Sequence, residues 1–235
     1  MVKTHIPKKR GRGRPLEKVY KSNALVNEAR YKLSLKEQRF IMFAISKIRK
    51  DDKNREYTFS VNDFAKALKW NSHNTYKNLR ILVKSLMNRS LSFFPDEDTE
   101  VWIHWFDKVV YKRYKATISF TFSNELTPHL FNLKEKFTAF KLEPVLKFGS
   151  IYSIRIYELL KEAQWQGGKE ISLDDLRQLL GLSDKYPMYK DFRRNVLMVA
   201  KQELAQKSDI RFTYEPIKSG KRVVAVFLKC NKKSK

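Results

Sequence analysis

The chain has 235 residues and a formal net charge of +24, from 49 Lys and Arg against 25 Asp and Glu. This length predicts two domains of about 110 residues, and the cationic surplus predicts a polyanionic partner, with nucleic acid favoured over an anionic membrane surface. A single cysteine, Cys230, excludes an internal disulfide framework, no apolar run approaches the roughly 18 residues of a membrane-spanning helix, and the N-terminus lacks a secretory signal, so we expect a cytoplasmic protein.

Residues 1–22 are predicted to form a basic tail. Lys and Arg dominate residues 1–20, where Glu17 is the one acidic residue, so we expect this stretch to be disordered when free. Residues 10–15, with the sequence RGRGRP, resemble the core of an AT-hook, in which Arg12 and Arg14 would enter a narrow A·T minor groove. The alternative is a tail that binds phosphates without sequence preference.

A first structural unit is expected over residues 23–132. Ser34 is a candidate N-cap for a helix over residues 35–48, and a second helix around residues 76–86 has Leu79, Val83 and Leu86 on its core side. The outward side of that second helix contains polar and basic residues together with one apolar residue, namely Asn74, Lys77, Ile81, Lys84, Ser85 and Asn88. Asn74, Lys77 and Lys84 are candidate DNA contacts, although a mixed face of this kind could equally pack against a protein.

Three runs of alternating polarity, over residues 101–106, 109–114 and 117–122, predict a three-stranded meander that serves as the wing of this unit. It contains more large aromatic residues than a small wing needs, namely Trp102, Trp105, Phe106 and Tyr111. Either they form a thick local core or they form a protein interface, since aromatic residues are enriched at such interfaces.

A linker over residues 133–148 is expected to precede a second unit over residues 149–235. Its first helix is predicted over residues 150–164, with Ile151, Ile154, Tyr157 and Leu160 on one face. Ser172 is then a candidate N-cap for a short helix that Gly181 ends, and a long helix is predicted from about Pro187 to Gln206. A hairpin of residues 210–214 with 223–228, across a turn at residues 218–221, forms the wing.

The long helix of the second unit is the candidate base-reading helix. At 100° per residue, Phe192, Val196, Val199 and Ala200 face the core. The opposite side contains the candidate DNA contacts Lys190, Arg194, Leu197 and Lys201, flanked by Arg193. The cations could reach guanine O6 and N7 or phosphates, and Leu197 could contact a thymine methyl group. Lys218, Lys221 and Arg222 at the wing tip would hold the adjacent backbone or minor groove. The alternative is an ordinary solvated basic face.

The two units repeat one pattern, which predicts an internal duplication. Residues 59–64, 76–80 and 91–93 of the first unit correspond to residues 171–176, 189–193 and 210–212 of the second. Each unit reads as a helix, a strand, two helices and then strands, which is the winged helix-turn-helix arrangement. We therefore predict an α+β fold with two tandem winged-helix domains.

Patterns for catalysis are weak. The four histidines, His5, His73, His104 and His129, are scattered, so we expect neither a metal site nor a histidine-dependent nuclease. Gly220 and Lys221 do not complete a phosphate-binding loop, because position 215 is glutamate and position 222 is arginine. We expect no cofactor and no enzymatic activity.

Several motifs resemble the initiator replication proteins of iteron-containing plasmids. They are residues 27–30 (NEAR), Leu35 with residues 37–39 (EQR), residues 151–160 (IYSIRIYELL), and Tyr189 with Phe192, Val196 and Phe212. The resemblance covers residues 23–230. It implies a double winged-helix protein that binds direct repeats at an origin as a monomer, helps to melt A·T-rich DNA, and recruits the host initiator and the replicative helicase. It also implies that a dimer can repress its own promoter.

By the same resemblance, the base-reading helix of the family corresponds to the helix that contains Lys190, Arg193, Arg194 and Lys201. The helix faces themselves assign sequence readout mainly to the second unit, and assembly, including a possible homodimer, together with auxiliary DNA contact to the first. The rival interpretation is a winged-helix repressor or architectural protein that opens no DNA. Tandem direct repeats nearby would favour the initiator, and a single inverted repeat the repressor. RNA binding is the weaker third possibility, because paired aromatic stacking motifs are missing.

Overall fold

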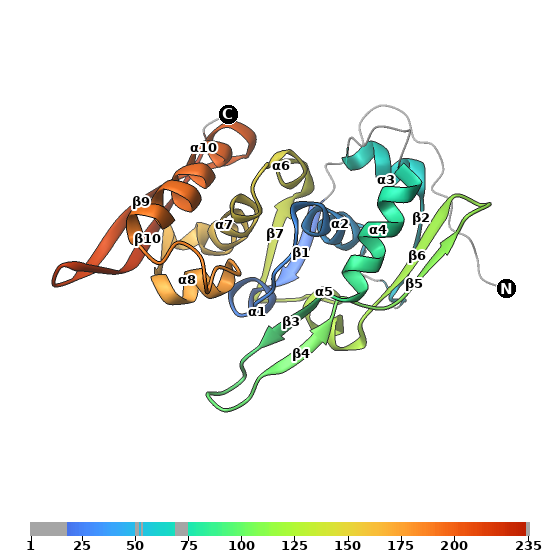
Figure 1. The fold of residues 1–235 in the computed structure, drawn as a ribbon, viewed down its shortest axis with the longest axis horizontal. Helices are drawn as coiled ribbons and strands as arrows, with labels where there is room; N and C mark the ends of the chain where they lie inside the picture. Colours follow the sequence, from blue (N-terminus) through green and yellow to red (C-terminus); the bar gives the residue numbers. More distant parts are fainter. Residues whose placement is uncertain (1–17, 50–51, 53, 69–74, 234–235) are drawn as a thin grey trace.

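The computed structural model describes residues 18–49, 52, 54–68 and 75–233, so the candidate contacts Arg12, Arg14 and Asn74 lie outside the described residues. Among the described residues the strands form two three-stranded and two two-stranded sheets. Helices pack against them along the long axis of the molecule (Figure 1).

The first unit opens with β1 (Lys18–Ser22), α1 (Asn23–Asn27) and α2 (Leu35–Ile45). Ser34 caps α2 as predicted: its hydroxyl accepts the Glu37 N–H at 3.3 Å, and the Glu37 carboxylate accepts the Ser34 N–H at 2.6 Å. The helix ends at Ile45, before the predicted Ile48, because the chain tightens there. The Lys47 and Ile48 N–H groups bond to carbonyls three residues back, and the Ser46 hydroxyl bonds to the Phe43 carbonyl at 2.7 Å.

The rest of the first unit contains β2 (Glu56–Ser60), α3 (Val61–Leu68), α4 (Thr75–Met87), β3 (Ser90–Phe93), β4 (Val101–His104), β5 (Phe106–Lys112) and β6 (Thr117–Phe122). The predicted meander is wrong at its first strand: β4 pairs with β3, while β5 joins the sheet β2–β6–β5. Trp105 stands at the bend between β4 and β5, where its fully buried ring packs edge-on against Tyr31. This anchor turns the chain from one sheet into the other.

The aromatic residues of this region divide between core and surface. Trp105 and Phe106 are buried, and Phe106 packs with Phe40 and Phe120, so the core interpretation holds for them. Tyr111 is partly buried against the core, whereas Trp102 is 66% exposed and lies outside it.

The end of the predicted tail and the predicted linker fold together. After η2 (Asn124–Leu126) and α5 (Thr127–Leu130), the chain forms β7 (Phe137–Lys141) and α6 (Leu142–Lys147). Strand β1 pairs antiparallel with β7, from Lys18 opposite Lys141 to Ser22 opposite Phe137. Residues 18–20 are therefore ordered, contrary to expectation, because the alternation of β1 turns Val19 and Lys21 into the interior.

The second unit contains α7 (Ile151–Glu162), η3 (Ala163–Gln166), β8 (Gly168–Ser172), α8 (Leu173–Leu179), α9 (Tyr189–Phe192), η4 (Arg193–Leu197), α10 (Met198–Lys207), β9 (Ile210–Ser219) and β10 (Arg222–Lys232). Its sheet has the order β8–β10–β9. Ser172 caps α8 as predicted, Ser150 caps α7, and Gly181 follows α8 with a φ of +65°. Pro187 lies before the long helix, which begins only at Tyr189 because Met188 is extended.

Helix α7 lies near the middle of the molecule (Figure 1) and joins the two units. It contacts α1 and β7 on one side and β8, β10 and α10 on others. The predicted single apolar face is therefore too narrow, because residues 153–160 are all buried, and Ile151 is only partly buried. The polar members Arg155 and Glu158 are buried together with Lys21 and Tyr31 of the first unit.

Candidate nucleic-acid interface

The candidate base-reading helix is continuous from α9 through η4 to α10; we call residues 189–207 the recognition helix. In its middle, η4 is a π-helical turn, in which the Met198 N–H bonds to the Arg193 carbonyl five residues back. The predicted cations Lys190, Arg193, Arg194 and Lys201 are all exposed.

The predicted contact Leu197 is wrong. Leu197 is 0% exposed in the core, whereas Val199, which was predicted to be core, is 36% exposed. The physical reason is the π-turn, which takes up one more residue than an α-turn and so rotates the downstream helix relative to a uniform 100° pattern. Met198, 46% exposed, is an apolar side chain on the surface near the position assigned to Leu197.

Two charged side chains fasten the recognition helix to its surroundings. Arg177 of α8 donates to the carbonyls of Tyr186 at 3.2 Å and Pro187 at 2.9 Å, and its guanidinium lies over the Phe192 ring at 5.4 Å. Arg177 thereby holds the loop that enters the recognition helix. Near the other end, Glu203 accepts the N–H groups of Gly149 at 2.7 Å and Ser150 at 3.0 Å, at the start of α7.

The charged form of the Glu203 carboxyl is stabilised by its hydrogen bonds. Burial alone would raise the pKa of this carboxyl, but its hydrogen bonds with Lys207 and with the backbone at Gly149 and Ser150 outweigh burial and lower the pKa. The recognition helix is therefore fastened at both ends, to the loop before it and to the start of α7.

The cations themselves remain available for a ligand. Arg194 forms an ion pair with Asp191 at 3.0 Å, but the Arg194 side chain is 66% exposed and that of Asp191 39%, and such solvent-accessible pairs contribute little. Lys201 lies on the side of the wing, with its Nζ 6.0 Å from the centre of the Tyr214 ring of β9.

The wing of the second unit is longer than predicted. Strands β9 and β10 pair from Ile210 opposite Lys232 to Ser219 opposite Arg222, and Gly220 supplies a φ of +58° in the turn. The hairpin projects away from the helices (Figure 1), and Lys218, Lys221 and Arg222 are exposed at its tip.

Helix α4 of the first unit also presents a basic surface. Lys77, Lys84 and the 59%-exposed Ile81 face outward as predicted, and so does Arg80, which the spacing from Lys77 could have revealed. Leu82 is buried and Val83 only partly so, which corrects the predicted core side.

Ser85 is not an outward residue. Its hydroxyl donates to Glu37 at 2.6 Å, and Arg89 pairs with the same carboxylate at 3.2 Å. Burial would raise the pKa of Glu37, yet the hydrogen bonds from Ser85, Ser34 and Arg89 together lower it. Glu37 thus ties α4 to α2, as Glu203 ties the recognition helix to α7.

The hairpin β5–β6 supplies a basic tip that the sequence assignment omitted. Lys112, Arg113 and Lys115 surround the fully exposed Tyr114 between these strands. The sequence pattern could have indicated this basic tip, since three cations flank one turn between two runs of alternating polarity.

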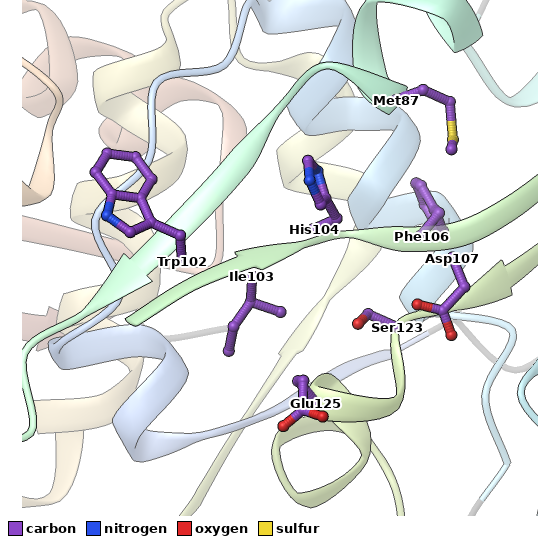
Figure 2. Close-up of a pocket in the computed structure, with 8 residues that line it drawn as sticks. All are labelled: Met87, Trp102, Ile103, His104, Phe106, Asp107, Ser123 and Glu125. Carbon is purple, nitrogen blue, oxygen red and sulfur yellow. The ribbon is translucent and has the colours of Figure 1, made fainter. Parts of the chain in front are cut away.

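A shallow hollow of about 440 Å³ lies between β4 and the turn before η2. Figure 2 shows Trp102 and His104 on one side of β4 and Ile103 on the other. Asp107, at its margin, is paired with Arg55 at 2.8 Å. Within the described part of the chain, no group of three His, Cys, Asp or Glu residues could hold a metal ion. No helix there combines the length and apolarity that crossing a membrane requires.

The chain is similar to two curated proteins of Escherichia coli. A replication initiation protein is 29% identical over 211 residues, which cover 84% of this chain and 65% of that protein. The PI protein is 29% identical over 126 residues, which cover 47% of this chain and 40% of that protein. The chain therefore spans less than two thirds of the length of either relative.

Two solved structures share the fold. The crystal structure of the Pi initiator protein in complex with iteron DNA matches with a TM-score of 0.77 at 20% identity, over 95% of this chain and 100% of that one. Domains 2 and 3 of RctB match with a TM-score of 0.50 at 12% identity, over 86% of this chain and 85% of that one. Their identities are low, so these likenesses concern the fold alone.

Two family models match consecutive parts of the chain. The model described as "Initiator Replication protein, WH1" matches residues 18–161, and that described as "Initiator Rep protein, WH2" matches residues 172–229. The first match includes β1 and nearly all of α7, so it extends beyond residues 23–132, and the second contains the recognition helix and most of its wing. With its two winged-helix units, the chain belongs to the initiator replication protein family.

Proposed function

We propose that this protein is a sequence-specific double-stranded DNA-binding initiator of plasmid replication, which binds direct repeats at an origin and acts by binding and not by catalysis. The observation that carries the proposal is the exposure of Lys190, Arg193, Arg194 and Lys201 on one buttressed helix beside a basic wing. A helix with cations on its outer face suits the major groove, and a basic hairpin tip suits the neighbouring backbone.

The family and the likeness to an initiator in complex with iteron DNA support repeats of this kind as the ligand. Helix α4 and the recognition helix lie in different halves of the long axis (Figure 1), which suits successive parts of one site. In this proposal the second unit reads sequence, while Lys77 and Lys84 of α4 add contacts to the backbone. Arg12 and Arg14 would add tail contacts in the minor groove or on phosphates.

Several further steps belong to the same proposal. An array of bound copies would bend the origin and help to open adjacent A·T-rich DNA. Bending a site of 20–30 base pairs costs on the order of 1–6 kcal/mol, which many phosphate contacts can offset. The resemblance adds recruitment of the host initiator and the replicative helicase. It also adds a homodimer, formed through the first unit, that represses the promoter.

Selection of duplexes from a random pool at about 0.15 M salt tests the proposal, because nonspecific phosphate binding is already weakened there. We expect enrichment of one asymmetric site of roughly two helical turns. Arg194→Ala should weaken the enrichment, and Lys229→Ala, which removes an exposed cation of β10, should leave it intact. A palindromic site would favour a dimeric repressor, and tight binding without enrichment would refute sequence readout.

Permanganate footprinting on a supercoiled origin tests the opening step separately. We expect reactive, unpaired thymines beside the repeats at saturating protein. Full occupancy of the repeats without reactive thymines would remove melting from the proposal and favour an architectural role.

A further inference from the structure

The recognition helix contains a change of hydrogen-bond register between its cations. The π-turn η4 lies at residues 193–197, after Lys190 and before Lys201. Such turns are rare, and they occur frequently at functional sites. The burial of the neighbouring side chains indicates what effect the π-turn η4 has on the helix.

The buried side chains of the recognition helix would form an unusually wide face in a regular α-helix. Val196, Leu197, Ala200 and Leu204 are buried at spacings typical of one helical face. Continued backwards at α-helical spacing, the middle of that face falls on residue 193, three before Val196 and four before Leu197, while Phe192, four before Val196, falls at its edge. A regular helix would thus place Arg193 in the middle of the buried face and leave Phe192 at its edge, about 100° from the middle.

The structure has the opposite arrangement. Phe192 is fully buried, with the Arg177 guanidinium over its ring, and Arg193 is exposed. The additional residue of the π-turn makes this possible, because it rotates the first turn of the helix relative to the rest. That first turn includes Lys190 and ends at Arg193, and N-terminal residues of a recognition helix are those that contact base edges.

Two side chains of the π-turn reach back to Asp191. The Asn195 amide donates to the Asp191 carbonyl at 2.9 Å, and Arg194 pairs with the Asp191 carboxylate at 3.0 Å. Asn195 is half-buried, and its bond is a side-chain bridge from the π-turn to the regular turn before it.

We propose that the π-turn sets the phase of the DNA-reading surface, and that Asn195 is the positioning residue that holds it. The turn keeps Phe192 in the core and Arg193 in line with the other cations that face the groove. This inference rests on the proposed function, since it concerns how the same helix meets double-stranded DNA.

Two variants at one position separate phase from direct contact. Asn195→Ala removes the bridge and keeps the additional residue. Deletion of Asn195 instead removes that residue. The five buried side chains then fall at the spacing i, i+3, i+4, i+7 and i+11 of a regular helix; they are Phe192, Val196, Leu197, Ala200 and Leu204. The deletion variant therefore keeps Phe192 and the downstream buried residues on one face without the hydrogen bond from Asn195 to Asp191.

We expect Asn195→Ala to weaken binding to the selected site by about two- to tenfold, the range that one hydrogen bond spans. The deletion should bind within about twofold of the wild type. Gln202→Ala, on the exposed side of α10, is the matched control and should leave the affinity unchanged. Equal losses in both Asn195 variants would instead assign Asn195 a direct contact with DNA and overturn the proposal. So would full affinity in Asn195→Ala.

Hydrogen exchange of the free protein provides a readout that is independent of DNA. Amides of residues 193–198 should exchange faster in Asn195→Ala and at least as slowly as in the wild type in the deletion. A deletion variant that fails to fold, judged by circular dichroism, would refute the regular-helix argument. If the wild type selects no DNA site while the exchange results hold, the proposed function fails and the phasing of the helix stands.

Discussion

Replacing Glu158 with glutamine should destabilise the junction between the two winged-helix units. The Glu158 carboxylate is fully buried and accepts hydrogen bonds from Lys21 Nζ at 3.1 and 3.2 Å and from Arg155 Nη1 at 2.6 Å. The variant keeps the shape of the side chain but leaves two buried cations without their counter-charge. Breaking a buried ion pair in this way costs about 3–5 kcal/mol.

The surrounding groups set where in that range the loss should fall. Arg155 retains hydrogen bonds to the Tyr31 hydroxyl at 2.7 Å and to the Ala29 carbonyl at 3.1 Å. Lys21 can shed its proton, because burial already lowers its pKa to about 8 and the loss of Glu158 would lower the pKa further. We therefore expect a loss near the lower limit, about 3 kcal/mol.

Urea denaturation at pH 7, followed by circular dichroism, measures the loss. Glu162→Gln is the matched control: it lies one turn further along α7, is less deeply buried, and is 3.6 Å from Lys169. Its loss should stay below about 1 kcal/mol. Lys21→Met combined with Glu158→Gln should cost less than the sum of the single losses, because the two residues are directly coupled. Equal losses for Glu158→Gln and Glu162→Gln would refute the reasoning.

Burial has the largest effect on the pKa of Lys21 and lowers it from 10.5 to about 8, so folding releases the Lys21 proton between these pH values. The free energy of unfolding of the wild type should therefore rise with pH relative to that of Lys21→Met from about pH 8, by up to about 1.4 kcal/mol per pH unit in urea titrations. A difference between the two proteins that does not change with pH would contradict this prediction. Arg194→Ala and Lys190→Ala should each weaken binding to the selected duplex by about 1–3 kcal/mol with little change in melting temperature, whereas unfolding would contradict their exposure. Leu197→Ala should destabilise the protein by about 2–5 kcal/mol in urea and Val199→Ala by less than about 1 kcal/mol, and the reverse order would argue against the π-turn. Deleting residues 1–17, which spares β1, should reduce affinity at all DNA sequences and flatten its salt dependence in filter binding, whereas a loss confined to A·T-rich sites would favour the AT-hook interpretation.

Local structure was predictable wherever the deciding contacts lie within a few residues. Ser34 and Ser172 cap their helices as expected, since a capping hydroxyl needs only the next turn of backbone. Gly181 and Gly220 occupy left-handed positions, which glycine adopts without steric cost. The order of helices and strands in the two units was therefore predictable from the sequence alone.

The sequence predicted which cations of the candidate site are exposed, but it did not predict which residues of the recognition helix face the core. Lys190, Arg193, Arg194 and Lys201 are exposed as expected, because long cationic side chains are rarely buried without partners. Leu197 and Val199 exchanged places because a uniform helical period cannot anticipate a π-turn. The π-turn accompanies the burial of both Phe192 and Leu197, and burial is a property of the assembled core.

The sequence by itself determined the two winged-helix units, their caps and turns, and the basic character of the recognition helix, because each depends on near neighbours and on side-chain chemistry. Only the tertiary structure decided that β4 pairs with β3, that β1 pairs with β7, and that Lys21 meets Glu158 in the interior. These contacts join residues that are far apart in the chain. Strand partners and buried charges are chosen by the packing of the whole molecule, about which a local pattern carries no information.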